Sequence, residues 1–113
     1  MFDDVVNELA PKFEEADGLV IASPVYYASA NATATFDELN KYFTISGMPI
    51  ASSQYWNSIH GRTPGEAEQD EEGKQTMRML ATNMTFLMKS IALGKEKFGL
   101  PEKEERVATH FIR

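Results

Sequence analysis

The stretch that most constrains this chain is residues 17–31, which read DGLVIASPVYYASAN. Its short apolar run, Leu19–Ala22, is bounded by turn residues, a pattern typical of a strand that is buried on both faces. Pro24 has no backbone N–H for a sheet ladder, so we expect the strand to end there. The residues that follow would then lie at the carboxyl end of the strand, where open α/β sheets bind their ligands.

The loop after this expected strand combines flat aromatic faces with hydrogen-bonding groups. Tyr26 and Tyr27 offer aromatic rings that carry hydroxyl groups, while Ser23, Ser29 and Asn31 offer polar side chains. A planar ligand with polar edges would suit such a loop. A buried strand that ends in an ordinary turn explains the same residues equally well, so the loop alone does not decide between the two interpretations.

Composition narrows the classes of function. The chain has 113 residues, which is in the range of a single domain, and 42% of them are hydrophobic. A net charge of -6 disfavours nucleic-acid and anionic-membrane partners, which select basic surfaces. With no cysteine, these residues supply no disulfide, thiolate metal site or cysteine nucleophile. No membrane-spanning run or signal sequence is apparent, so we expect a cytoplasmic protein.

Periodicity predicts three helices. Apolar residues at helical spacing favour helices over residues 3–16, 33–43 and 69–98, with Thr33 or Thr35 as the cap of the second. Residues 49–52 are a candidate second strand, and residues 107–112 are either a final strand or an extended tail. This alternation of helices with short apolar runs predicts an α/β domain with a parallel sheet over residues 1–113.

The segment from Ser53 to Gly65 and the last expected helix are the two features that bear on contact with a second subunit. The segment is rich in large polar and aromatic residues: Tyr55, Trp56, Asn57, His60 and Arg62. It is either a flap on its own domain, a lid over a ligand or a subunit contact. The last helix carries one apolar stripe (Met77, Leu80, Met84, Leu87, Met88 and Ile91) and a second apolar face (Met79, Phe86 and Leu93). We therefore expect a homodimer or larger homo-oligomer with Trp56 at or near the interface.

The sequence shows no set of catalytic side chains. His60 and His110 have no further ligands at metal-binding spacing, and neither a nucleophile elbow nor a phosphate-binding P-loop occurs. Paired acids such as Glu14-Glu15 are more simply solvated helix faces. We therefore predict no catalytic residue and no metal site, a pattern that fits an enzyme whose cofactor carries the chemistry.

Two segments resemble one protein family. The stretch EADGLVIASPVYYASAN resembles the flavin-binding loop of the flavodoxin-like NADPH-dependent FMN reductases, in which an S-P-V-Y loop wraps the flavin ring. The stretch MPIASSQYWNSIHGRTPGEAEQDEEGKQTMRMLATNM resembles the carboxyl-terminal third of the same family. The two matches occur in the family's order and together cover most of the chain.

The resemblance implies a flavodoxin-like three-layer sandwich and a function. It implies an FMN-binding oxidoreductase that takes a hydride from NADPH or NADH and passes electrons to a small-molecule or protein acceptor. A flavodoxin-like electron carrier and a non-catalytic interaction module are the alternatives. The residues that the resemblance places around the flavin ring are Ser23, Pro24, Val25, Tyr26, Tyr27, Ala28, Ser29 and Asn31.

The family pattern also implies missing pieces. A helix followed by a buried strand is half of a βαβ unit, which implies a strand before Asp3 and the phosphate-binding loop that follows it. After the S-P-V-Y loop the family pattern expects a helix, a central strand and a second flavin-facing loop, but this sequence passes directly to ATATFDEL. We therefore expect the chain to be interrupted at Asn31-Ala32, with the intervening segment present in the molecule and absent from the printed residues.

Overall fold

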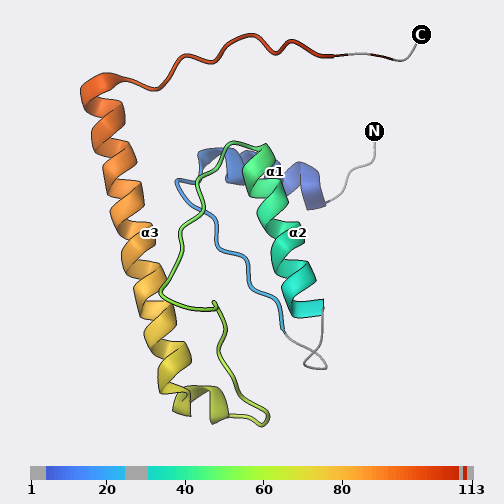
Figure 1. Cartoon of the computed structure of the whole chain (residues 1–113), viewed down its shortest axis with the longest axis vertical. Coiled ribbons are helices and arrows are strands. Elements are labelled where there is room, and N and C mark those ends of the chain that lie inside the picture. Colours follow the sequence, from blue (N-terminus) through green and yellow to red (C-terminus); the bar gives the residue numbers. More distant parts are fainter. Residues whose placement is uncertain (1–4, 25–30, 110, 112–113) are drawn as a thin grey trace.

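The computed structural model describes residues 5–24, 31–109 and 111, and within these ranges the chain is helical (Figure 1). The elements in chain order are α1 (Val5–Glu15), α2 (Asn31–Ile45), the short 3-10 helix η1 (Glu66–Gln69) and α3 (Glu71–Phe98). The three predicted α-helices are thus confirmed, with boundaries that differ by a few residues.

Helix α2 begins and ends two residues outside its predicted bounds. Thr33 and Thr35 lie inside the helix, so the prediction that one of them caps it is wrong. At its other end the Met48 N–H donates to the Phe43 carbonyl at 2.9 Å, and the Gly47 N–H donates to the Thr44 carbonyl at 3.1 Å. Gly47 has a φ of 71°, so α2 ends in a Schellman motif, whose left-handed position favours glycine.

Helix α3 is the longest element, with 28 residues, and its ends follow the expected chemistry. Asp70 caps the amino end by accepting the Gly73 N–H, and the acidic side chains of Glu71 and Glu72 lie in the first turn. Lys95 and Lys97 lie in the last turn, so charges of both signs complement the helix dipole.

The expectation of a flavodoxin-like parallel sheet is wrong for this chain. No strand occurs in the described ranges, and both predicted strands, residues 19–22 and 49–52, run as irregular chain. Val20 is 70% exposed, whereas the prediction required burial on both faces. A strand buried on both faces needs a neighbour on each side for its N–H and C=O groups. This sequence moves from one apolar run to the next through α2 alone, with no central strand to pair with either.

The point at which an interruption is expected lies within α2. Asn31 and Ala32 are consecutive residues in the first turn of α2. This placement does not test the expected interruption, which stays a prediction, and residues 25–30 lie outside the described part of the chain.

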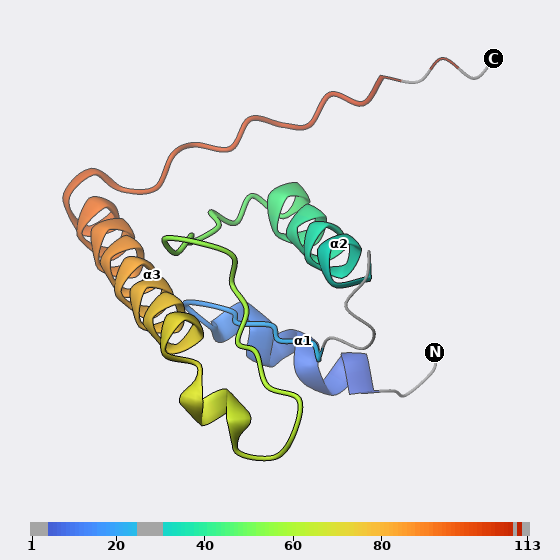
Figure 2. The same ribbon diagram turned by 60° about the horizontal axis from the view of Figure 1, so that its bottom comes forward.

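The helices surround two extended segments without closing on a core. In both views α3 lies on one side, α1 and α2 lie on the other, and residues 16–24 and 48–65 run between them (Figures 1 and 2). The radius of gyration is 18.3 Å, whereas a compact domain of this length has about 13 Å. No hydrophobic side chain of the described residues is fully buried. The chain on its own therefore leaves much of its apolar surface uncovered.

The two apolar faces of α3 differ in how far they are covered. Met77, Leu80 and Met84 are partly buried, and a Cβ at Gly18 would lie only 2.6 Å from the Met84 terminal methyl group. The segment after α1 thus packs closely on this stripe. On the second face, Phe86 is 73% exposed and Leu93 is 63% exposed. The first stripe is covered only along its first part, because Met88 and Ile91 are 37% and 44% exposed, whereas the second face is open at Phe86 and Leu93.

Candidate functional site

The predicted flavin loop is only partly within the described residues. Ser23 and Pro24 are exposed at the end of the segment that follows α1, and Asn31 is the first residue of α2. The remaining predicted residues, Val25, Tyr26, Tyr27, Ala28 and Ser29, lie outside the described part of the chain. The expected position of this loop at a sheet edge is wrong, because the described residues form no sheet. The expectation that both tyrosines border an open cleft concerns residues outside the described part of the chain and stays a prediction.

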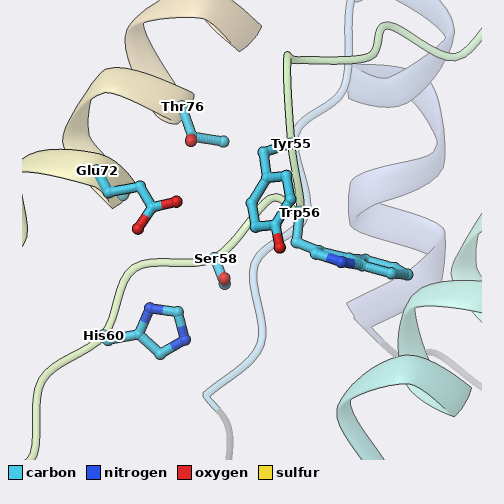
Figure 3. A pocket seen from close by; sticks show the side chains of 7 residues that line it. Tyr55, Trp56, Ser58, His60, Glu72 and Thr76 are labelled. Atoms are coloured by element: carbon cyan, nitrogen blue, oxygen red, sulfur yellow. The ribbon is translucent and has the colours of Figure 1, made fainter.

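A second candidate site lies where residues 55–60 meet the first turns of α3 (Figure 3). The hollow has a volume of about 330 Å³. Its lining residues are Tyr55, Trp56, Ser58, His60, Glu72, Gly73 and Thr76. The Tyr55 ring faces the hollow, whereas the Trp56 indole extends away from it. Polar groups from two distant parts of the sequence thus meet around one space.

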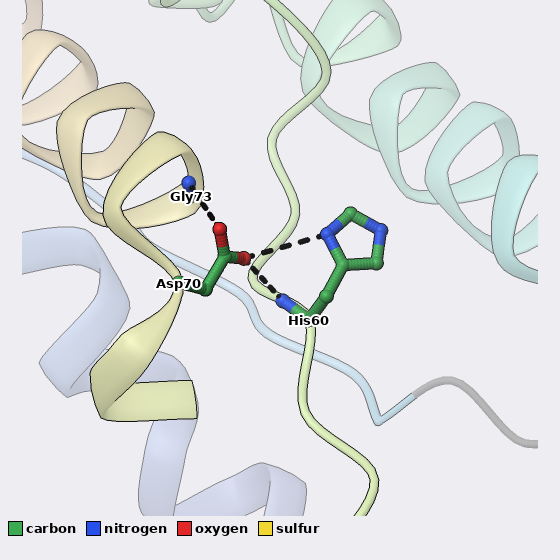
Figure 4. Close-up of polar contacts among 3 residues, drawn as sticks. All are labelled: His60, Asp70 and Gly73. Carbon is green, nitrogen blue, oxygen red and sulfur yellow. Dashed lines mark hydrogen bonds and ion pairs between the residues drawn. The ribbon is translucent and has the colours of Figure 1, made fainter. Parts of the chain in front are cut away.

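The Asp70 carboxylate joins this loop to α3 (Figure 4). One oxygen accepts the Gly73 N–H at 2.9 Å, and the other accepts the His60 N–H at 2.6 Å. The His60 Nδ1 also lies 3.4 Å from that second oxygen. The Gly73 N–H, followed by the His60 N–H, holds the pKa of Asp70 below its ordinary value, because both hydrogen bonds favour the charged form. Asp70 therefore caps α3 and also holds His60 of the loop against the helix, and we call this pair of contacts the clamp.

A second carboxylate holds the turn that precedes α3. Glu66 accepts the Arg62 N–H at 2.6 Å and the Thr63 N–H at 3.0 Å. The Arg62 N–H is the larger cause of the lowered pKa of Glu66. At the other end of the loop, Asn83 Nδ2 donates to the Ser52 carbonyl at 2.7 Å. These contacts support the interpretation of residues 53–65 as a flap that is anchored on its own α3.

Gly73 is required for this close approach. A Cβ there would collide with the Asp70 carboxylate and lie 3.0 Å from the Ile59 Cα. Gly73→Ala would gain about 1 kcal/mol from helix propensity, but overpacking costs about 1–3 kcal/mol. We expect a net loss of stability in thermal or denaturant unfolding. Gly94→Ala is the matched control in the same helix, because its Cβ would meet nothing within 4 Å, and it should stabilise the chain. Equal stabilisation by both would contradict the packing.

The clamp should depend on pH. Because the folded-state pKa of Asp70 is lowered, its contribution to stability is present above the unfolded value of about 3.9 and is lost as the pH falls through the lowered folded pKa. We expect acid titration followed by Trp56 fluorescence to show the loop leaving α3. Asp70→Asn should flatten this transition, because the amide does not titrate in this range. An unchanged transition in Asp70→Asn would show that another group controls it.

Sequence reasoning did not identify the clamp. The predicted helix begins at residue 69, which places Asp70 inside it, whereas Asp70 is the cap and α3 begins at Glu71. The contact between Asp70 and His60 joins residues ten positions apart through an irregular loop. No periodic pattern reports such a contact.

Comparison with known proteins places the chain in a family. Residues 1–65, more than half of the chain, match the family described as NADPH-dependent FMN reductase. The chain therefore belongs to the NADPH-dependent FMN reductase family, as the resemblance indicated. It is also 22% identical to an iron-sulfur flavoprotein of Methanocaldococcus jannaschii over 129 residues, covering 78% of this chain and 67% of that protein. No solved structure matches the chain significantly.

The alignment with the iron-sulfur flavoprotein also bears on the central segment that the family pattern expects and this sequence lacks. Seventy-eight per cent of this chain is about 88 residues, whereas the alignment extends over 129 positions. About 40 aligned positions therefore have no counterpart in this chain. This supports the inference that an internal segment of the family pattern is absent.

Two further properties concern the described residues alone. None of the helices in the described ranges is both long and apolar enough to cross a membrane. The same ranges contain no group of three or more side chains that could hold a metal ion.

Proposed function

We propose that this protein binds FMN and catalyses NAD(P)H-dependent reduction of the flavin, which then reduces a small-molecule or protein acceptor. Membership of the NADPH-dependent FMN reductase family carries the proposal, because the matched residues 1–65 contain the whole predicted ring-binding loop. The flavoprotein relative supports the same cofactor.

The chemistry of the donor set fits the flavin ring. Tyr26 and Tyr27 would cover an apolar ring face, and Ser23, Ser29 and Asn31 would bond its polar edge. The predicted loop contains no lysine, arginine or glycine-rich turn for the FMN phosphate. The residues named here therefore fit the ring portion of the cofactor and leave the phosphate without an assigned partner.

The cofactor and the loop residues would have separate roles in the reaction. FMN, when bound, supplies the acceptor for a hydride from NAD(P)H. The loop residues orient the ring and exclude water from one of its faces. The loop supplies no histidine or carboxylate, so proton transfer by a protein side chain is not part of the proposal.

None of these 113 residues is assigned to an iron-sulfur cluster. Such clusters are held by cysteine thiolates, and these 113 residues contain no cysteine. The proposal thus takes from the iron-sulfur flavoprotein only the flavin.

A homodimer or larger assembly is part of the proposal. The open face of α3 and the 65% exposed Trp56 leave large apolar groups on one chain. In a homo-oligomer, a second copy of the same chain would cover these groups, so no other protein would be needed.

Oxidation of NADPH and NADH by the purified chain, with FMN added and with a dye acceptor, tests the proposed activity. We expect oxidation that depends on both FMN and the chain. Flavin binding without such oxidation would favour the electron-carrier alternative, and the absence of both would favour an interaction module.

A further inference from the structure

The carboxyl-terminal tail, residues 101–109 and 111, is exposed at every described position. Val107 is 91% exposed and Phe111 is 90% exposed. Residues four positions apart in an extended chain lie on the same side, so these two apolar side chains share one face of the tail. None of residues 101–109 makes a hydrogen bond or ion pair with another described residue. The described part of the chain therefore supplies no polar contact that holds the tail.

An open groove lies beside the end of α3 from which the tail leaves. Its volume is about 760 Å³. The apolar part of its lining consists of Met88, Ile91, Ala92 and Leu100. On a single chain these side chains are open to solvent, since Ile91 is 44% exposed and Leu100 is 64% exposed. The groove thus offers an apolar surface of the kind that protein contacts cover.

The charged groups of the groove and of the tail complement one another. The groove is lined by two acids and two lysines, which are Asp17, Glu96, Lys89 and Lys95. The tail carries three acids and two basic residues, which are Glu102, Glu104, Glu105, Lys103 and Arg106. None of these nine groups has an ion-pair partner among the described residues. Exposed ion pairs contribute little affinity, so the charges would set the register and the apolar contact would supply most of the binding.

The tail does not lie in the groove of its own chain. Gly99, at the end of α3, has a φ of 75° and a ψ of 176°, and Pro101 follows two residues later. The chain turns here, and in both views the tail runs away from α3 (Figures 1 and 2). A groove and a tail that match in chemistry but not in direction on one chain can meet between two chains.

We propose that the tail of one copy lies in the groove of a second copy, in a reciprocal exchange. Val107 and Phe111 would cover the apolar lining around Ile91. Each copy would contribute ten described tail residues and eight groove residues, which is close to the lower limit of about 20 residues a side for a standard interface. The inference rests on the proposed homo-oligomer, adds a contact to the open face of α3, and requires no bound FMN.

Cross-linking tests the exchange, because the chain has no cysteine of its own. Val107→Cys is introduced into a tagged 113-residue chain and Ile91→Cys into an untagged one, so a product that contains one chain of each kind has its own mass. The two chains are mixed and treated with a short bis-maleimide linker. We expect the mixed product. Ser90→Cys is the matched control, because this neighbouring exposed residue does not line the groove, and it should give far less mixed product.

Light scattering on the same samples separates this inference from the proposed oligomer. A dimer without the mixed product, or with equal yields from Ile91→Cys and Ser90→Cys, would overturn the tail exchange alone, whereas a monomer would overturn both. A chain that carries Val107→Cys and Ile91→Cys together and is cross-linked within itself as a monomer would place the tail in its own groove. That result would also overturn the exchange.

Limited digestion of the unaltered chain with trypsin gives a test that needs no substitution. Trypsin cleaves after Arg106, beside the apolar part of the tail. We expect this cleavage to be at least about tenfold slower well above the dissociation constant of the dimer than well below it, as burial of one large apolar side chain implies. Cleavage after the exposed Lys12 of α1 is the internal control and should not change with concentration. An equal rate after Arg106 at both concentrations would overturn the proposal.

Discussion

Tyr26→Asp should weaken the binding of FMN to this protein by at least about tenfold. The predicted contact of Tyr26 with the flavin is an apolar ring face, and a carboxylate placed there would lose that contact and desolvate a charge. It would also repel the negatively charged phosphate of FMN. Quenching of FMN fluorescence on titration with the chain measures the change, and tenfold corresponds to about 1.4 kcal/mol of binding free energy.

Tyr42→Asp is the matched control for this prediction. Tyr42 lies on α2, is 70% exposed and is not part of the predicted loop. The same chemical change there should leave FMN affinity unaltered. If Tyr26→Asp bound FMN as tightly as the unaltered chain, the assignment of residues 23–31 to the flavin would be wrong.

Phe86→Asp on the open face of α3 should convert the expected homodimer to monomers. Phe86 is 73% exposed on a single chain, and burying such a side chain at an interface contributes about 1.5–3 kcal/mol. In a symmetric dimer the substitution acts twice, so we expect the dissociation constant to rise at least about a hundredfold. Light scattering coupled to size-exclusion chromatography gives the mass directly.

Thr85→Asp adds the same charge at the neighbouring exposed position and should leave the assembly intact. If Trp56 is at or near the interface, its emission should move to longer wavelength on dilution of the unaltered chain and not in Phe86→Asp. A monomer at micromolar concentration for the unaltered chain would contradict the oligomer proposal.

The helices could be predicted from the sequence, but the sheet prediction was wrong, and the reasons are physical. The α3 signals are local: apolar residues recur every three to four positions, acids lie at the start, and Gly99 with a φ of 75° lies just past the end. A strand, in contrast, depends on distant partners. Leu19–Ala22 has the composition of a buried strand, but the described part of the chain contains no neighbouring strand for it to pair with.

The two candidate sites also differ in how far they could be predicted from the sequence. The S-P-V-Y loop could be identified because its residues are adjacent in the sequence and belong to a family motif. The hollow could not, because Tyr55, Glu72 and Thr76 come together only when the irregular loop folds back on α3. The sequence pointed to Trp56 and His60 as unusual residues but did not indicate that Asp70 would hold His60 in place.

Retention and reduction of FMN by the purified full-length protein test the central claim most directly. The protein is incubated with FMN, separated from free cofactor by gel filtration, and then mixed with NADPH or NADH without oxygen. The account predicts that flavin elutes with the protein and that its visible absorption is lost on addition of a nicotinamide cofactor and returns with an electron acceptor. Elution of all FMN apart from a folded, helical protein would contradict it.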